Sequence, residues 1–318
     1  MGAFLADAAS LGLHGMYDGD KIVQLLEKGK DVVLPPEFHK PLNKEYKAKA
    51  GGFSAYAYEL LPLMHTLMGH NKVETDLLST DMLAFLSGFK GHITPVMQDF
   101  AANAKRGAMG REAASQKNHA NSLVKVPLMV ARYAGDAALM ENVATAVQLH
   151  QSDGDALLAA QLFAAILERL TVFGGSLQAA VHWAGTKEAA LPGKAKEWLQ
   201  DVLSKHALSA VDGARDIGIG LGSQQVLKSG LHIALKSEDY VSGIRQSILA
   251  GGDSTSRAHV VGALLGGQHG EQALPGEWRR KATKFMDVKQ MVHVIIVQRT
   301  KFVPFHINRD LAQQSQAG

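Results

Sequence analysis

The stretch that decides the fold is Gly251-Gly-Asp-Ser-Thr-Ser-Arg-Ala-His-Val-Val-Gly-Ala-Leu-Leu-Gly-Gly-Gln-His-Gly270. The two leading glycines let the backbone turn tightly, and Asp253 follows at a position where a helix N-cap favours a carboxylate. A helix is therefore predicted from Ser254 to His269. Gly262, Ala263 and Gly266 keep one face of this helix small, so we expect another helix to approach it closely.

Apolar residues at spacings of three and four predict helices along most of the remaining chain. The stretch 143–173 is interrupted at 153–155, where we expect a helix end, a short loop and an N-cap. In the stretch 54–68, Pro62 predicts a kink or an early break. Further helices are expected over 77–89, 95–104, 122–134, 194–206, 224–235, 240–250 and 275–281.

The best candidate for a strand is the β-branched run Val292–Val297. A single strand has no partner for its backbone hydrogen bonds, so we favour the end of a buried helix that begins at Phe285. The fold class predicted from the sequence is therefore all-α. We expect one domain over residues 1–318, with a long irregular loop at 31–52 and a frayed tail from about 313.

Composition excludes several classes of function. The net charge is +3, and the basic residues are scattered without a run of five like charges, so we expect no nucleic-acid partner. The N-terminus lacks a basic region and Asp7 interrupts it, and no run of about 18 uninterrupted apolar residues occurs, so we expect a cytoplasmic protein without a membrane partner.

The sequence contains no cysteine, which excludes disulfides, thiolate–zinc sites and cysteine nucleophiles. The absence of thiols would suit a long-lived protein at high concentration, although a reduced intracellular protein can also simply need none. No Gly-x-Ser-x-Gly elbow of a serine hydrolase is present. Gly218-Ile-Gly-Leu-Gly222 lacks the full dinucleotide pattern and is interpreted as a loop.

The block Gly251–Gly270, together with Pro275 and Trp278, resembles the C-terminal signature of ADP-ribosylglycohydrolases. Weaker similarity extends over most of the chain, and includes segments at 2–14, 121–128, 131–136 and 151–153. The resemblance implies a compact orthogonal multi-helix bundle. It also implies an ancestral activity that removes ADP-ribose, with a pair of magnesium ions held partly by the aspartates of the signature.

Two departures from the family pattern concern the metal site. Thr255 stands where the hydrolases have their second aspartate, and Ser256 and Arg257 follow it. Where the hydrolases have Thr-Asp-Asp-Thr, this chain reads Phe53-Ser-Ala-Tyr-Ala-Tyr-Glu59, in which only Ser54 resembles the motif. With these departures, the sequence resembles the branch of the family that contains selenoprotein J and the jellyfish J-type lens crystallins.

A pair of magnesium ions needs several carboxylates, and the aligned positions keep only Asp253. A single aspartate at a helix N-terminus is more typical of a cap than of a ligand. Asp7 and Asp153 are the other acids that could complete a vestigial or alternative metal site, and capping and solvation are their simpler roles. The remaining candidate residues of a vestigial cleft are Ser54, Tyr56, Asn121, His150, Thr255 and Ser256.

Three functional hypotheses follow. The first is a structural, lens-crystallin-like protein without a cofactor, which would be a catalytically silent homologue with a degenerate magnesium site and would self-associate weakly. The second is an active magnesium-dependent hydrolase that removes ADP-ribose from proteins or small molecules. The third is a binding module that holds ADP-ribose without cleaving it.

Overall fold

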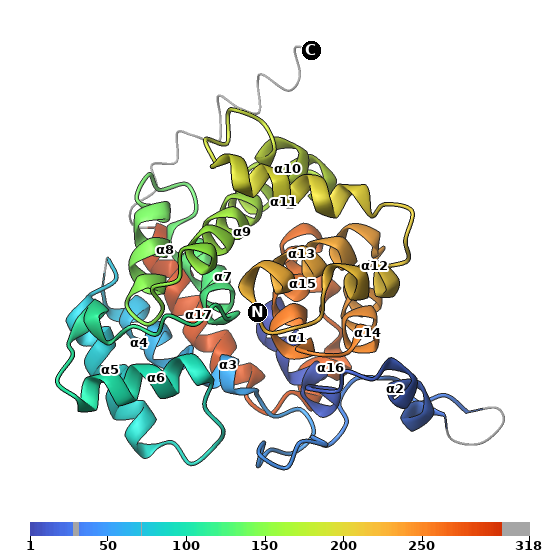
Figure 1. Ribbon diagram of the computed structural model, residues 1–318, viewed down its shortest axis with the longest axis horizontal. Helices are drawn as coiled ribbons and strands as arrows, with labels where there is room; N and C mark the ends of the chain where they lie inside the picture. Colours follow the sequence, from blue (N-terminus) through green and yellow to red (C-terminus); the bar gives the residue numbers. More distant parts are fainter. Residues whose placement is uncertain (28–31, 71, 301–318) are drawn as a thin grey trace.

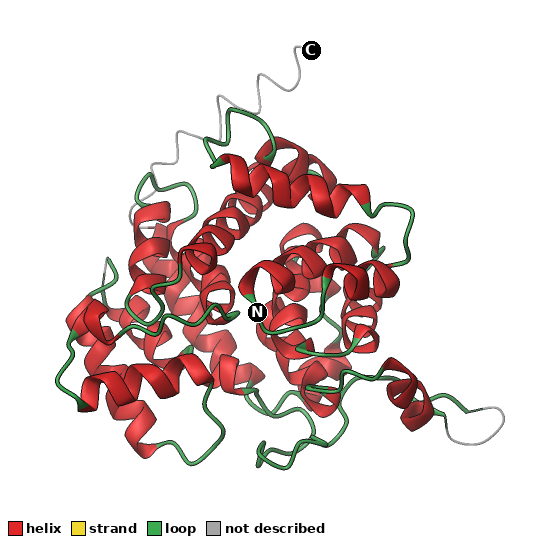
Figure 2. Cartoon of the chain, viewed as in Figure 1, coloured by secondary structure: helices red, strands yellow, loops and turns green. Residues whose placement is uncertain are grey.

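All regular secondary structure in the described residues is helical (Figures 1 and 2). The structure is a computed structural model that describes residues 1–27, 32–70 and 72–300. Its α-helices are α1 (Gly2–Ser10), α2 (Gly19–Leu26), α3 (Ala55–Tyr58), α4 (Leu61–Gly69), α5 (Thr75–Gly88), α6 (Pro95–Lys105), α7 (Asn121–Tyr133), α8 (Leu139–Gln148), α9 (Gly154–Phe173), α10 (Leu177–Ala184), α11 (Gly193–Ser204), α12 (Ala210–Ile217), α13 (Ser223–Lys236), α14 (Tyr240–Ala250), α15 (Ser254–His269), α16 (Gly276–Lys281) and α17 (Phe285–Thr300).

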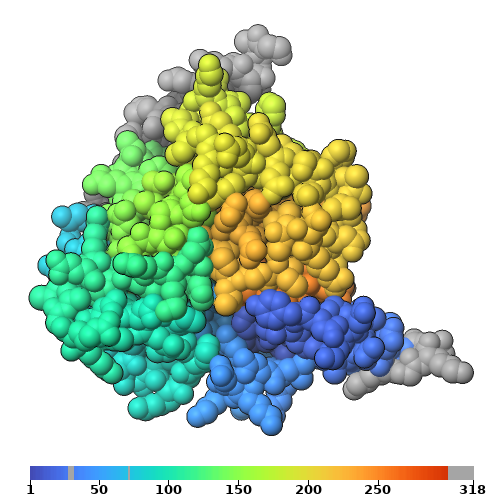
Figure 3. All heavy atoms as spheres, in the orientation of Figure 1, coloured from blue at the N-terminus to red at the C-terminus, as the bar shows by residue number. Residues whose placement is uncertain are grey.

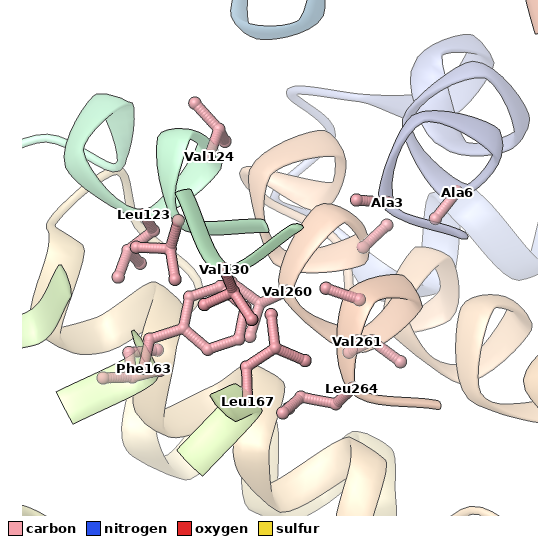
Figure 4. Packing of buried hydrophobic residues seen from close by; sticks show 14 of the residues in the cluster. Ala3, Ala6, Leu123, Val124, Val130, Phe163, Leu167, Val260, Val261 and Leu264 are labelled. Carbon is pink, nitrogen blue, oxygen red and sulfur yellow. The ribbon is translucent and has the colours of Figure 1, made fainter. Parts of the chain in front are cut away.

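Helices α1 and α15 pack closely against each other, although they are far apart in the sequence. A Cβ atom added to Gly262 would lie 2.6 Å from the Ala6 Cβ and 2.7 Å from the Gly2 oxygen. The predicted small face of α15 is thus confirmed, because only a bare backbone fits there. Figure 4 shows Ala3 and Ala6 of α1 beside this helix.

The largest apolar cluster is organised around α9, the longest helix. This helix packs against α7, α8, α10, α13 and α15, and Phe163 and Leu167 reach the side chains of α7 and α15 (Figure 4). By length and composition alone α9 could cross a membrane. Its contacts on several sides account for the same hydropathy, because a central core helix is apolar nearly all round.

Two predicted interruptions are confirmed. Asp153 caps α9, and its carboxylate accepts the Ala156 amide at 2.8 Å. Pro62 lies in the first turn of α4, so the predicted stretch 54–68 is divided into two helices, α3 and α4. The run Val292–Val297 lies within α17, so the interpretation as helix rather than strand is also confirmed. The expectation that this helix end is buried is wrong in part, because Val294, Ile296 and Val297 are exposed.

The other predicted helices are found with ends that differ by at most a few residues, and the all-α prediction is confirmed. Three helices of eight residues, α2, α10 and α12, were not predicted from periodicity. Each follows a capping residue, respectively Asp18, Ser176 and Ser209, whose side chain accepts a backbone N–H of the first turn. The capping signal was therefore present where the apolar pattern was too short.

The predicted irregular loop holds no helix or strand over residues 32–52, while residue 31 lies outside the described part. Its end is fixed at Gly51, whose φ is +77° and whose added Cβ would lie 2.0 Å from the Lys281 oxygen. The Gly51 oxygen accepts the Thr283 amide at 2.9 Å. The loop is thus fastened to the connection between α16 and α17. The predicted frayed tail from about 313 lies outside the described residues.

Candidate functional site

The glycine pair before α15 brings the end of α1 to the start of α15. Gly252 has φ +67°, and a Cβ there would lie 2.1 Å from the Ile219 oxygen. Its amide donates to the Met16 oxygen at 2.6 Å, and its oxygen accepts the Gly15 amide at 2.9 Å. Asp253 therefore starts α15 within the interior, beside the segment that follows α1.

The Asp253 side chain does not cap its helix, which corrects the expectation of a simple N-cap. Asp253 occupies the N-cap position, but its carboxylate makes no capping hydrogen bond. Instead its Oδ2 accepts the Tyr56 hydroxyl at 2.9 Å, and its Oδ1 lies 3.4 Å from His14 Nδ1. The residue is fully buried. The protein thus uses this carboxylate to join α3, α15 and the end of the first helical segment.

His14 connects Asp253 with Thr255. Its Nδ1 lies 3.2 Å from the Thr255 hydroxyl and 3.4 Å from the Thr255 amide. Burial lowers the pKa of His14, and the nearby Asp253 charge opposes that effect. His14 faces Asp253 and Thr255 with the same ring nitrogen, Nδ1. The three residues therefore do not form a relay in which one ring nitrogen faces the acid and the other faces the hydroxyl.

A buried arginine, Arg257, interacts electrostatically with this carboxylate. The guanidinium is fully buried, and its Nη2 donates to the Ser247 oxygen at 2.7 Å and to the Gly251 oxygen. Burial lowers the pKa of Arg257 to about 10 and the Asp253 charge raises it, so the group is charged at neutral pH. Arg257 therefore closes the C-terminal end of α14 and balances the Asp253 charge.

Asp7 is the second buried acid of this region, and solvation does not describe its role. Its Oδ2 accepts the Ser54 amide at 2.9 Å, and its Oδ1 accepts the Ser54 hydroxyl at 2.5 Å. Burial raises the pKa of Asp7 to about 7, Ser54 lowers it, and the nearby Asp253 charge raises it further. The carboxyl group thus fastens the start of α3 to α1.

The loop before α3 covers these residues through Tyr46. The Tyr46 ring packs on His14 with centroids 5.5 Å apart and on His92 with centroids 4.9 Å apart. Burial and the charge of Asp253 raise the pKa of Tyr46 well above its usual value. We call Asp7, His14, Ser54, Tyr56, Asp253, Thr255 and Arg257 the Asp253 cluster, and Tyr46 is its outer cover.

A second polar group, the Glu59 cluster, holds two other predicted residues. Glu59 accepts the Thr94 amide at 2.7 Å, the Thr94 hydroxyl at 2.9 Å and the Asn121 side-chain amide at 2.9 Å. Lys125 donates to the Ala146 oxygen at 2.8 Å and lies 3.0 Å from His150 Nδ1. We define this cluster as Glu59, Thr94, Asn121, Lys125 and His150.

Burial dominates the titration of the Glu59 cluster. It raises the pKa of Glu59 to about 7 and lowers that of Lys125 to about 7, while the attraction between the two charges opposes both changes. It also lowers the pKa of His150 well below its usual value, and Lys125 adds to that effect. Neutral His150 can therefore accept a hydrogen bond from the lysine.

Asp153 belongs to neither cluster. Besides capping α9, its Oδ1 accepts the Asn118 side-chain amide at 2.8 Å. Asn118 Oδ1 in turn accepts the Ser223 amide at 2.8 Å, which links the starts of α9 and α13. The simpler interpretation of Asp153 as a capping residue therefore describes its contacts.

The structure thus divides the predicted site residues among separate groups. Asp7, Ser54, Tyr56, Asp253 and Thr255 come together in the Asp253 cluster. Asn121 and His150 lie in the Glu59 cluster, Asp153 is a cap, and the hydroxyl of buried Ser256 lies 3.5 Å from the Asp253 backbone oxygen. Within residues 1–27, 32–70 and 72–300, no group of three or more histidine or acidic side chains is placed to hold a metal ion.

The sequence alone predicts no role for His14, Tyr46, Lys125 or Arg257. A lysine or arginine within an otherwise apolar or small helix face was the available signal for Lys125 and Arg257, because such a charge is buried only when it has partners. No comparable local signal exists for His14 and Tyr46, whose contacts depend on how distant segments meet.

Comparison with known proteins identifies the family to which this fold belongs. The family model described as ADP-ribosylglycohydrolase matches residues 1–302. The chain belongs to the ADP-ribosylglycohydrolase family. The fold has a solved counterpart in a chain of an "ADP-ribosylglycohydrolase-related protein complex", with a TM-score of 0.65, 17% identity, and coverage of 94% of this chain and 96% of that one.

Two curated members of the family are crystallins of the jellyfish Tripedalia cystophora. Crystallin J1A is 27% identical over 311 residues, which cover 91% of this chain and 92% of the crystallin. Crystallin J1B is 25% identical over 320 residues, with coverage of 93% and 94%. The resemblance to the J-type crystallin branch of the ADP-ribosylglycohydrolase family is therefore confirmed.

Proposed function

We propose that this chain is a structural protein of the lens-crystallin type, and a catalytically silent homologue of ADP-ribosylglycohydrolases with a degenerate magnesium site. The observation that carries the proposal is the set of groups around the Asp253 carboxylate. One oxygen accepts the Tyr56 hydroxyl, and the buried Arg257 supplies a compensating positive charge.

Charge balance argues against a pair of divalent cations here. Two magnesium ions bring about four positive charges and need several oxygen ligands. Both oxygens of Asp7 accept hydrogen bonds from Ser54, and Ala55 and Tyr56 stand where the family motif has aspartates. A divalent ion beside Asp253 would also be repelled by Arg257 in an interior where charges are weakly screened. The donor set therefore does not match the family's metal pair.

Features outside the Asp253 cluster also support the proposed structural role. The sequence has no cysteine, so thiol cross-linking cannot occur during long storage at high concentration. The proteins that it resembles over more than nine-tenths of its length carry the name crystallin. We propose a cytoplasmic protein, packed at high concentration as in a lens, that self-associates only weakly.

Two measurements test this proposal. The protein is incubated with magnesium and ADP-ribosylated proteins, with an active family hydrolase as positive control, and no release of ADP-ribose is expected. Light scattering of concentrated solutions tests the structural role, and weak attraction without aggregation is expected. Robust hydrolysis that Asp253→Ala abolishes would overturn the catalytic part, and opalescence at moderate concentration would count against the structural part.

One observation favours a second candidate, a surviving magnesium-dependent hydrolase or an ADP-ribose-binding module. Asp7 and Asp253 are both buried and close enough for their charges to interact. An enzyme built on this pair should be stabilised against heat by magnesium, because a ligand of the native state raises the melting temperature. A binding module should give saturable titration with ADP-ribose but release no product.

A further inference from the structure

An apolar groove lies at the C-terminal half of α15, away from Asp253. Its volume is about 290 Å³, and its walls come from the start of α1 and from α7, α9, α15 and α17. The helical rise places Gly266, one of the lining residues, roughly 20 Å along the axis of α15 from Asp253. None of the described lining residues belongs to the Asp253 cluster or the Glu59 cluster. The groove is therefore separate from the vestigial site.

Small residues keep this groove open. Ala263, Gly266 and Gly267 of α15 and Ala131 of α7 line it and present little or no side chain. A Cβ atom at Gly267 would lie 3.2 Å from Leu167 Cδ1, so α9 closes that wall. The helices are thus close enough to enclose a space, and their facing side chains are too short to fill it.

The lining of the groove is almost entirely apolar. Apart from Thr171, Glu271 and Arg299, every described lining residue is apolar or a glycine. Val130 and Leu167, two of the apolar residues, are shown in Figure 4. Pockets that bind small organic molecules have this composition, in which apolar walls supply affinity and a few polar groups fix the orientation.

The groove is elongated along α17. Val292, Ile296 and Arg299 line it from successive turns of this helix, which span roughly 10 Å. Helix α17 is scarcely visible in the view of Figure 3, yet Ile296 is 41% exposed, so the groove opens to solvent on another side. A long, narrow apolar space with an open rim fits a linear chain better than a compact ring system.

Arg299 carries the charge that the groove leaves without a close partner. Its Nε is buried and has no hydrogen-bond partner among the described residues. Glu168 attracts Arg299 electrostatically, but it does not line the groove, and its carboxylate accepts the Gly135 amide at 2.8 Å. A buried donor without a partner costs free energy, and a ligand that supplies an acceptor removes that cost.

The opposite end of the groove carries little net positive charge. Glu271 lines that end, and it pairs with Lys289 at 2.6 Å and with Arg279 at 3.4 Å. Burial lowers the pKa of the Met1 amino group to about 6, although Glu271 opposes that effect. This amino group is therefore mostly neutral at pH 7. An anionic ligand would be oriented with its charge towards Arg299.

We propose that this groove binds a medium-chain fatty acid, with its carboxylate at Arg299 and its aliphatic chain between α15 and α17. The volume has room for roughly ten non-hydrogen atoms, because a water molecule takes up about 30 Å³ in the liquid. Transfer of the chain out of water supplies the driving force, and a guanidinium matches a carboxylate because it can donate two parallel hydrogen bonds. A neutral apolar molecule would leave Arg299 Nε unpaired, and a cationic one would be repelled. The site adds a binding activity to the proposed structural role and does not depend on it.

Calorimetric titration of the full chain tests the site with three probes: octanoate, octanol and octylammonium. The three share one chain length and differ in the charge of the head group. Saturable binding of octanoate is expected, with weaker binding of octanol and the weakest binding of octylammonium. Octanoate binding should also show a negative heat-capacity change, because apolar surface leaves water.

Two variants with matched controls locate the ligand. Arg299→Gln should weaken octanoate binding by about tenfold or more and leave octanol binding unchanged, whereas Arg111→Gln removes an exposed arginine outside the groove and should behave as wild type. Ala131→Met fills the groove and should weaken the binding of both probes. Ala102→Met adds the same side chain at an exposed position of α6 and should have no effect. Circular dichroism checks that each variant is folded, and Arg299→Gln tests the site even if Ala131→Met does not fold.

The outcomes separate this ligand from other occupants of the groove. No saturable octanoate binding, equal affinity for octylammonium, or octanoate binding that folded Ala131→Met retains would each overturn the proposal. Sedimentation equilibrium adds one further outcome. A dimer that Ala131→Met dissociates, in protein that does not bind octanoate, would assign the groove to a second copy of the chain instead. All of these measurements can be read whether or not the protein hydrolyses ADP-ribosylated substrates.

Discussion

The two ends of α15 differ in the kind of interaction that each makes. At its C-terminal half, Gly262 and Gly266 meet α1 so closely that no added carbon fits at Gly262. At its N-terminal end, Asp253 remains, but Thr255 and Arg257 surround it with a hydroxyl and a buried cation. One helix therefore combines family packing with a changed electrostatic site.

The difference shows that the packing of α15 on α1 and the charges at the N-terminal end of α15 are constrained separately. Close packing of α1 on α15 requires only small residues at fixed positions, whatever the neighbouring charges are. A metal pair requires net negative charge, so under the proposed function the Arg257 charge at the N-terminal end of α15 would oppose it. A change of charge at the N-terminal end of α15 is therefore compatible with unchanged packing at its C-terminal half.

The largest expected effect comes from substitution of Gly262, in the half of α15 that packs on α1. Gly262→Leu should prevent folding, and even Gly262→Ala should cost about 1–3 kcal/mol, because its Cβ would lie within 2.7 Å of Ala6 and of the Gly2 oxygen. Urea unfolding measures the change. The control is Gly266→Ala on the same face, where the nearest atom would be 3.4 Å away, and its stability should be unchanged or slightly higher.

The next effect concerns the buried cation at the other end of the helix. Arg257→Met leaves Asp253 without its compensating charge and the Ser247 and Gly251 oxygens without their donor, so the free energy of unfolding should fall by about 3–5 kcal/mol. Adding Asp253→Asn should restore part of that loss, which a double-mutant cycle would measure as a coupling energy.

Arg215 provides the matched control for Arg257. It also closes the end of α14, since its guanidinium donates to the Leu249 oxygen at 2.9 Å and the Ala250 oxygen at 3.3 Å, but it is more exposed. Arg215→Met should therefore cost less and should not couple to Asp253→Asn. Equal losses and equal couplings for the two arginines would show that Arg257 acts only as a helix cap.

A smaller effect is expected at Asp7, and the pH dependence of stability tests it. The pKa of Asp7 is raised from 3.8 to about 7, so the native state holds this proton more tightly than the unfolded chain does. Its contribution to stability is complete below pH about 4 and is lost as the pH rises to about 7. Asp7→Asn keeps a neutral side chain, so its stability relative to wild type should rise over this window by roughly 3 kcal/mol.

Thermal unfolding between pH 4 and pH 8 measures this change in Asp7→Asn. Glu59 has the same direction of pKa shift, whereas Lys125 has the opposite one, so only the difference between variant and wild type isolates Asp7. Asp20→Asn, which removes an exposed acid, should run parallel to wild type. A parallel curve for Asp7→Asn as well would contradict a raised Asp7 pKa.

Much of the fold could be predicted because its determinants are local. The helix-breaking effect of Pro62 and the cap at Asp153 act within a few residues, and both were recognised in the sequence. Helices α2, α10 and α12 were missed because eight residues are too few for a clear apolar period, although capping residues precede them.

The site was less predictable, since its contacts join segments far apart in the chain. Asp253 meets Tyr56 across 197 positions, and Asp7 meets Ser54 across 47. The sequence could identify Asp253 as a retained family position and Tyr56 as an altered one, but it could not show that the Tyr56 hydroxyl donates to Asp253. For the same reason, the sequence leaves open whether Asp7 belongs to a vestigial metal site or is a capping or solvated acid, and it could not show that Asp7 is buried against Ser54.

The smallest expected effect addresses that Tyr56–Asp253 contact. Tyr56→Phe removes the hydroxyl that donates to Asp253 Oδ2 and leaves the ring in place, so the unfolding free energy should fall by about 1–2 kcal/mol. Tyr58→Phe is the control, because Tyr58 contacts Phe53 and Phe89 through its ring. If Tyr56→Phe also leaves the melting temperature insensitive to magnesium, the hydroxyl alone does not keep the ion out, and the Arg257 charge remains the reason. A clear stabilisation by magnesium in Tyr56→Phe but not in wild type would show instead that a single hydroxyl separates this protein from a metal-binding relative.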